Sequence, residues 1–396
     1  MRPGPLTVLF LAAQAGPAAA QEDGPRLDLY GYVMLDMGYQ FGQSDPLFFD
    51  VMRPTQLPAF ENEFGGDGRT YFSVRQTRFG VRGFIPTALG EVRTLIEFDL
   101  FGSGTDAGET TFHLRHAYGE LGEFGAGKTL SPFQDLDGFP RSIEFWGPNG
   151  LVAFRNLQAR WMPIQGDTRM TVALLQPGGS ADEGVLEGRV ELEDVRARFP
   201  LPDLSAEYRQ ATSFGYVELA GIVRYMEWDD LNTDAFDLSG DATGWGVNLS
   251  SNIRIGSGGI IRLQGVYGEG IENYMNDAPV DVGAQANPGN AVTPVVGEAL
   301  PVFGFSGFYD HTWSSTWTSA IGYSTVDIDN SDLQLPSAFR RGHYALVNLL
   351  HSPVPQVLAG AELIFGRREN FRDGWTADDY RLQFSFKYSF QVTVGQ

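Results

Sequence analysis

The chain has 396 residues and a formal net charge of −21; only 19% of its residues are charged, whereas 13% are aromatic and 49 are glycine. It contains no cysteine, which excludes disulfides, thiolate zinc sites and cysteine nucleophiles. The acidic balance argues against nucleic acid as a partner, since binding phosphates needs a basic surface. Low charge with abundant glycine and aromatic residues favours strands joined by tight turns over a helical enzyme.

The N-terminus predicts a secretory signal peptide over residues 1–20. Arg2 supplies the positive charge, Leu6–Ala13 the apolar core and Ala18–Ala20 the small-residue cleavage site. No later stretch holds 18 consecutive apolar residues, so no membrane helix is expected. An exported chain without such helices spans a membrane only as a closed barrel, which we expect over residues 21–396.

Strict alternation of apolar and polar residues predicts long strands. It is clear over Leu27–Phe41, Tyr71–Phe84 and Glu91–Phe101. In the last strand one face carries only aromatic residues and leucine: Tyr380, Leu382, Phe384, Phe386, Tyr388 and Phe390. Long strands with an apolar face opposite a polar one are typical of a transmembrane antiparallel β-barrel, with lipid outside and water inside.

The connections alternate between short and long, as expected of a barrel with short periplasmic turns and long external loops. Short turns are predicted near Pro86–Gly90, Leu121–Gly122, Gln165–Asp167, Ala211–Phe214, Ile255–Gly258, Thr312–Ser314 and Ser352–Gln356. Long loops are predicted at 42–68, 102–110, 131–150, 177–202, 228–241, 270–299, 326–340 and 368–377. This pattern gives about sixteen strands. Within 177–202, the segment Gly188–Phe199 fits either a strand or part of a loop.

The loop over residues 131–150 is unusually apolar. It lies between strand-like segments at Glu123–Leu130 and Leu151–Met162, and its prolines interrupt regular structure. Its large apolar side chains are Phe133, Leu136, Phe139, Ile143, Phe145 and Trp146. A solvated loop does not normally expose that much apolar surface. We therefore expect this loop to fold into the barrel and to constrict the lumen. By contrast, Ser44–Asp67 is expected to be a polar loop.

Arginines on the polar strand faces are the strongest functional signal. They are Arg78, Arg82, Arg93, Arg115 and Arg160, and Lys128 is a weaker candidate. An arginine that faces lipid costs about 2–4 kcal/mol at the membrane midplane, so these side chains are expected to line the pore. Arginine offers two parallel hydrogen bonds to a carboxylate, which favours anions.

The acids of the 131–150 loop, Asp135, Asp137 and Glu144, are expected to face these arginines and to create a transverse field across the constriction. In the alternative reading, the arginines pair with Glu97, Asp99 or the loop acids in a structural network that selects nothing.

Other motifs carry less weight. Gly122–Thr129 matches the phosphate-binding pattern G-x-x-x-x-G-K-T, but Pro132 follows and no helical periodicity comes after, so no nucleotide site is expected. The five histidines form no metal set; His113 and His116 lie three apart on a strand and are expected to point to opposite faces. We therefore expect neither a cofactor nor a metal.

Several segments resemble the DcaP-type trimeric porins of Gram-negative outer membranes. They are LDLYGYVMLD (27–36), RQTRFGVRG (75–83), LRHAYGEL (114–121), GKTLSPFQD (127–135), FWGPNG (145–150), RNLQARW (155–161), TGWGVNLS (243–250), VYGEGI (266–271), the long run at 344–370 and LQFSFKYSF (382–390). The resemblance implies a sixteen-stranded trimeric barrel with an inward-folded loop, an arginine-rich constriction and uptake of small anions such as dicarboxylates. The coiled-coil segment of some members is not expected, because only 21–26 precedes the first strand.

The resulting hypothesis is an outer-membrane porin, without enzymatic activity, for diffusion of small hydrophilic solutes with a preference for anions. Its expected partners are small anionic solutes, outer-membrane lipid, lipopolysaccharide and two further copies of the chain. Lipopolysaccharide is named as a partner because the external loops are acidic. Their carboxylates either keep the rim of the barrel solvated or bind the phosphates of lipopolysaccharide through divalent cations. Two alternatives stay open, a barrel enzyme of the lipase or esterase type and a closed structural or adhesive barrel.

Overall fold

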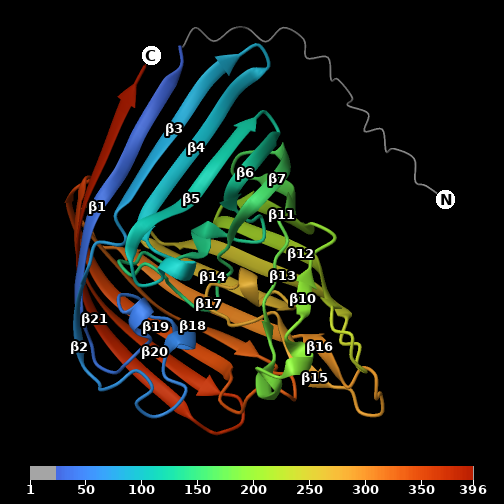
Figure 1. Ribbon diagram of the computed structural model, residues 1–396. Coiled ribbons are helices and arrows are strands. Elements are labelled where there is room, and N and C mark those ends of the chain that lie inside the picture. The colour runs from blue at the N-terminus through green and yellow to red at the C-terminus, as the bar shows by residue number, and fades with distance from the viewer. Residues whose placement is uncertain (1–23, 396) are drawn as a thin grey trace.

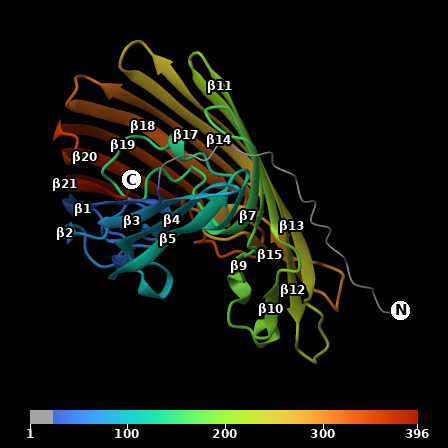
Figure 2. The same ribbon diagram turned by 90° about the horizontal axis from the view of Figure 1, so that it is seen from above.

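The computed structural model describes residues 24–395, and they form an antiparallel β-barrel (Figure 1). The predicted signal peptide over 1–20 lies outside the described residues. Within them, no helix has the length and apolar character needed to cross a membrane. Seen from above, the strands surround a central space that loops and short helical turns enter (Figure 2).

The barrel is a closed sheet of sixteen strands, which confirms the predicted number. They are β1 (Arg26–Gln40), β3 (Arg78–Thr87), β4 (Gly90–Phe101), β5 (Thr110–Leu121), β6 (Phe124–Leu130), β7 (Arg155–Ile164), β8 (Arg169–Leu175), β11 (Asp203–Thr212), β12 (Gly215–Asp230), β13 (Gly240–Ile255), β14 (Gly259–Glu269), β17 (Pro301–Thr312), β18 (Trp317–Ile328), β19 (Phe339–Val354), β20 (Val357–Asn370) and β21 (Thr376–Val394). Two short segments, β2 (Arg69–Ser73) and β10 (Val195–Arg198), extend the sheet beside β1 and β12.

Pairing of the first and last strands closes the barrel. Strand β1 pairs with β21 from Leu27↔Val394 to Gln40↔Arg381, and on its other side with β3. Closure pairs the first strand with the last, so neither end of the sheet leaves its backbone N–H and C=O groups facing lipid without partners. The short turns lie at the end of the barrel where the described chain begins and ends, and the long loops lie at the opposite end (Figure 1).

Alternation along the strands separates an apolar outer face from a polar inner face. In β21, Phe384 and Tyr388 are 42% and 57% exposed, whereas Gln383 and Ser385, on either side of Phe384 in the chain, are fully buried. The exposed apolar side chains suit lipid, and the inward ones meet the loops that enter the barrel.

The structure corrects three element boundaries. The strand expected over Tyr71–Phe84 is divided into β2 and β3 by a turn, and β7 begins at Arg155 rather than Leu151 because residues 151–154 pack with the loop inside. In the 177–202 segment only Val195–Arg198 joins the barrel sheet. The two-residue strand β9 (Ala181–Asp182) pairs instead with β15 (Val282–Ala286), which pairs with β16 (Val295–Ala299) in a separate sheet over the external loops.

Three loops, not one, fold into the barrel. Phe133, from the loop after β6, packs with Tyr274 from the 270–299 loop and with wall residues such as Ile222. The expectation that Ser44–Asp67 is simply a polar loop was wrong: Met52 and Leu57 are 1% exposed and pack against inward side chains of β19 and β20. The sequence signal for this packing was the apolar run Leu47–Met52, which only Asp50 interrupts.

Candidate functional site

The first half of the 131–150 loop is attached to the wall formed by β11, β12 and β13. Asp135 is fully buried and accepts hydrogen bonds at 2.6 Å from Arg209 Nη2, Tyr216 Oη and Ser250 Oγ. Asp137 accepts from Nη1 of the same arginine at 2.6 Å. The expected opposition between these two acids and the predicted arginine wall is therefore wrong, because both carboxylates are turned to Arg209.

The second half of this loop crosses to β19, β20 and β21. Gln383 Nε2 donates to the Ile143 carbonyl at 2.9 Å, and Glu362 accepts from the Ile143 amide at 3.3 Å. The Glu144 carboxylate accepts from the amides of Met52 and Gly147, and burial raises its pKa. Glu144 thus holds two loops together, and it too does not face the predicted arginines.

Between this loop and the inner face of β3–β5 lies a cavity of about 570 Å³. Five of the described residues that line it are arginine or lysine: Arg53, Arg78, Arg115, Lys128 and Arg155. Phe139, Phe145 and Trp146 of the loop form its apolar side. The structure therefore brings three of the predicted residues, Arg78, Arg115 and Lys128, to one place and adds two that sequence reasoning missed.

Three of the five cations have acidic partners behind the cavity surface. Arg115 binds Glu97 at 3.0 Å and Asp99 at 2.6 Å, and Arg78 lies 3.6 Å from Glu97. This part of the wall matches the structural network that was the alternative reading. The third is Arg53, whose Nε lies 2.9 Å from Asp277.

Lys128 and Arg155 differ from these three. Neither side chain makes a hydrogen bond or an ion pair with any other residue in the described part of the chain. The one acid among the described lining residues is Glu272, whose carboxylate oxygens are buried without a hydrogen-bond partner. Burial, with the nearby Asp281, raises the pKa of Glu272 well above its ordinary value.

Strand alternation alone misplaces Arg155. Arg155 lies two residues before Leu157 in β7, so strict alternation puts both side chains on the same face. Leu157 is 52% exposed on the outer face, and Lys128 is its direct partner in β6. The ladder between β5 and β6 ends at Ala117↔Lys128, so beyond this pair no wall strand separates the two cations from the cavity. The missed signal was the short length of β6, which ends after only seven residues.

The remaining predicted arginines lie elsewhere. Arg93, beside the turn between β3 and β4, has a side chain 56% exposed and binds Glu91 at 2.8 Å. The Arg82 guanidinium covers the Tyr30 ring at 4.2 Å. Arg160 donates to the Leu130 carbonyl at 2.5 Å and so braces the point where the loop leaves β6. None of these three lines the cavity.

Two other sequence motifs also find their place. Gly122–Thr129 forms a turn and strand β6, with no helix to receive a phosphate, as expected. The expected opposite orientation of His113 and His116 was wrong: a bulge in β5 shifts the register, so His113 contacts Asp99 and His116 contacts Thr129. No group of residues able to hold a metal is found in residues 24–395.

Comparison with known proteins agrees with this geometry. The model of the DcaP outer membrane protein family matches residues 16–252, more than half of the chain. No curated protein sequence matches. Among solved structures, the outer membrane channel DcaP of Acinetobacter baumannii superposes with a TM-score of 0.76 at 22% identity, over 94% of this chain and 100% of that one.

Two further structures share the fold. An anion-selective porin from Comamonas acidovorans has a TM-score of 0.56 and 12% identity, over 92% of this chain and 100% of that one. The trimer form of OmpT from Vibrio cholerae has a TM-score of 0.55 and 13% identity, over 93% and 100%. At these identities the likeness concerns the fold.

Proposed function

Because this chain belongs to the DcaP outer membrane protein family and is located in the outer membrane, we propose that it is a diffusion channel that prefers small anions, dicarboxylates among them. The 131–150 loop acts as its constriction. The observation that carries the preference for anions is the pair Lys128 and Arg155, two cations at the cavity that have no acidic partner among residues 24–395.

Electrostatics explains how the cavity would select. Arg53, Arg78 and Arg115 are compensated by acids behind them, so they supply donors in fixed positions more than net charge. Lys128 and Arg155 supply the net positive potential that attracts an anion and repels a cation. A solute with two carboxylates can contact both groups of cations at once. Binding at such a site must be weak enough for the solute to leave, because conduction requires both entry and release.

The experiment is a measurement of reversal potential in planar bilayers under a KCl gradient. Replacing both Lys128 and Arg155 by Ala should lower the permeability ratio of chloride to potassium. Arg93→Ala is the matched control, since Arg93 is exposed, paired with Glu91 and outside the cavity. An unchanged ratio in the double variant would refute the proposed anion site.

Two arms of the same experiment address the finer claims. Adding a four-carbon dicarboxylate should reduce chloride current more than adding the monocarboxylate of the same length, and equal effects would remove the preference for dicarboxylates. A barrel that never conducts would instead support the closed structural alternative, which the three inward loops make worth testing.

A trimer is the assembly we propose, supported by the trimer form in which the OmpT relative was solved. Its mass in detergent, measured by light scattering, should be three times that of one chain. A monomer mass in mild detergent and in lipid discs alike would contradict it.

A further inference from the structure

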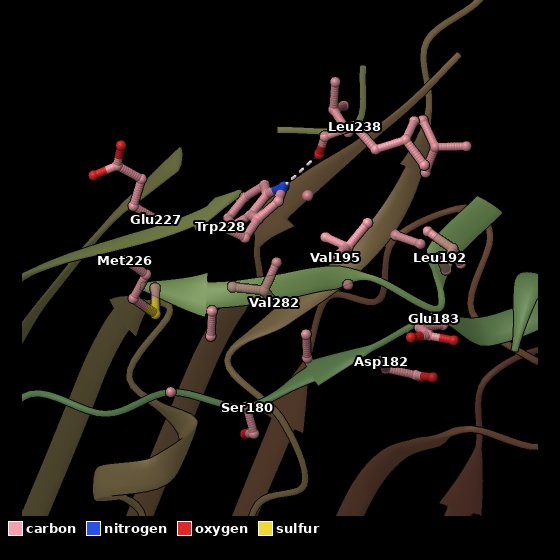
Figure 3. A pocket seen from close by; sticks show the side chains of 18 of the residues that line it. Ser180, Asp182, Glu183, Leu192, Val195, Met226, Glu227, Trp228, Leu238 and Val282 are labelled. Atoms are coloured by element: carbon pink, nitrogen blue, oxygen red, sulfur yellow. Dashed lines mark hydrogen bonds between the residues drawn. The ribbon is translucent and has the colours of Figure 1, made fainter. Parts of the chain in front are cut away.

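A second cavity lies outside the channel, among the external loops (Figure 3). The small sheet of β9, β15 and β16 forms one side, and the outer ends of β10 and β12 form the other. Its volume is about 240 Å³. An engineered apolar cavity of about 150 Å³ holds a benzene ring, so this one has room for a ring or a short alkyl chain.

The lining of this cavity is mainly apolar. Met226 and Val282 are 4% and 7% exposed, and Val195 lies across from them (Figure 3). The Trp228 indole Nε1 donates to the Leu238 carbonyl at 2.9 Å. That bond satisfies the only hydrogen-bond donor of the indole side chain. Trp228 therefore presents an apolar ring face to the cavity.

Charge at the edge of the cavity is negative. Glu183 is exposed, and its carboxylate has no hydrogen bond or ion pair with other residues between 24 and 395. Asp182 beside it accepts hydrogen bonds at 2.8 Å from the Gly184 amide and from Gln334. Glu227 also borders the cavity, but its side chain points away, toward an ion pair with Arg198 (Figure 3). The charge left for a ligand is therefore that of Glu183 and Asp182.

We propose that this cavity binds a small amphiphilic cation, an apolar ring or chain of about six carbons that carries an ammonium group. The apolar part enters beside Trp228, Met226 and Val282, and the ammonium group stays at the edge near Glu183 and Asp182. Apolar walls with a few polar groups at one end are the common composition of small-molecule sites. This site does not rest on the proposed channel function, and its sign of charge is opposite to that of the channel cavity.

The test is calorimetric titration of the barrel in lipid discs with butylammonium, hexylammonium, hexanol and hexanoate, with empty discs as the blank. Each buried methylene should raise the affinity roughly fourfold, so hexylammonium should bind roughly sixteen times more tightly than butylammonium. Hexylammonium should also bind at least about threefold more tightly than hexanoate. Equal heats from filled and empty discs, or tighter binding of hexanoate, would overturn the proposal.

Variants locate the binding. Ala197→Phe fills the cavity and should abolish the heat of hexylammonium binding, whereas Ala291→Phe, on an exposed part of the external loops outside the lining, should leave it unchanged. Glu183→Gln should reduce the difference in affinity between hexylammonium and hexanol, with the charge of Asp182 left in place. If Ala197→Phe does not fold, the titrations of the natural protein with the four ligands of different chain length and charge still test the proposal. Loss of binding in both phenylalanine variants, or in neither, would place the ligand elsewhere.

Discussion

The attachment of the 131–150 loop to Arg209 provides a direct test of how the proposed constriction is held. Asp135 and Asp137 both bind this guanidinium at 2.6 Å, but the Asp135 side chain is fully buried and that of Asp137 is 55% exposed. We predict that Asp135→Asn loosens the loop and that Asp137→Asn does not. The two variants make the same chemical change on the same loop, at the same distance from the same partner.

The magnitude follows from burial. Asp135 accepts three charge-assisted hydrogen bonds, from Arg209, Tyr216 and Ser250, in a place that water does not reach. Removing one partner of a buried pair costs about 3–5 kcal/mol, whereas an exposed pair contributes about 0–1 kcal/mol. Each 1.4 kcal/mol is a factor of ten. Asp135→Asn should therefore raise the population of detached loop by roughly two to three and a half powers of ten.

Single-channel recording is the assay. A loop that leaves the wall widens the path, so Asp135→Asn should show higher or noisier conductance and weaker anion selectivity, while Asp137→Asn should resemble the natural protein. The barrel itself should still fold, because the sixteen-strand ladder does not depend on this bond. Identical conductance and noise in the Asp135 variant would refute the idea that burial of this carboxylate holds the constriction.

Three other predictions follow from the described contacts. Replacing Arg78 and Arg160 by Ala should lower anion over cation permeability, since each removes a positive charge inside the barrel; unchanged reversal potentials would contradict this. Burial raises the pKa of Glu272 from the ordinary 4.5, so the folded state keeps a proton that the unfolded state releases, and stability should fall as pH rises from that value toward the folded pKa. The thermal stability of Glu272→Gln should not show this decline with pH. Parallel stability profiles of the natural protein and the variant would contradict the prediction. Phe386→Arg, on the lipid face, should cost about 2–4 kcal/mol in denaturant unfolding in vesicles, while Ser389→Arg, on the inner face, should cost less; equal losses would reverse our assignment of the faces.

Much of the fold could be predicted from local pattern. The period of two in strands such as β21 identifies both the strand and the face that meets lipid, because every second side chain points the same way. Turn positions such as Pro86–Gly90 were also confirmed, since glycine and proline mark them locally. The pattern could not show where a strand is interrupted, as between β2 and β3, because that depends on the contacts of Arg75 with Asp50 from a distant loop.

The candidate site was predicted only in part. Arg78 was expected on the inner face from alternation and lines the cavity; Arg115 lines it too, from the bulge in β5. Arg53 was missed because it lies in a loop without periodicity, and only the packing of that loop brings it beside Asp277 and Trp146. Arg155 was missed because alternation assigns it to the outer face.

By itself, the sequence determined the barrel, the number of its strands, the two faces and the presence of an apolar loop suited to its interior. These are local properties, set by neighbours along the chain and by the solvent on each face. Only the tertiary structure decided which charges meet: Asp135 with Arg209, Glu144 with the Met52 amide, and Lys128 and Arg155 with no acidic partner in the part of the chain that the structure describes. Ion pairing depends on distances between residues far apart in the chain, and three loops packed together inside one barrel set those distances jointly.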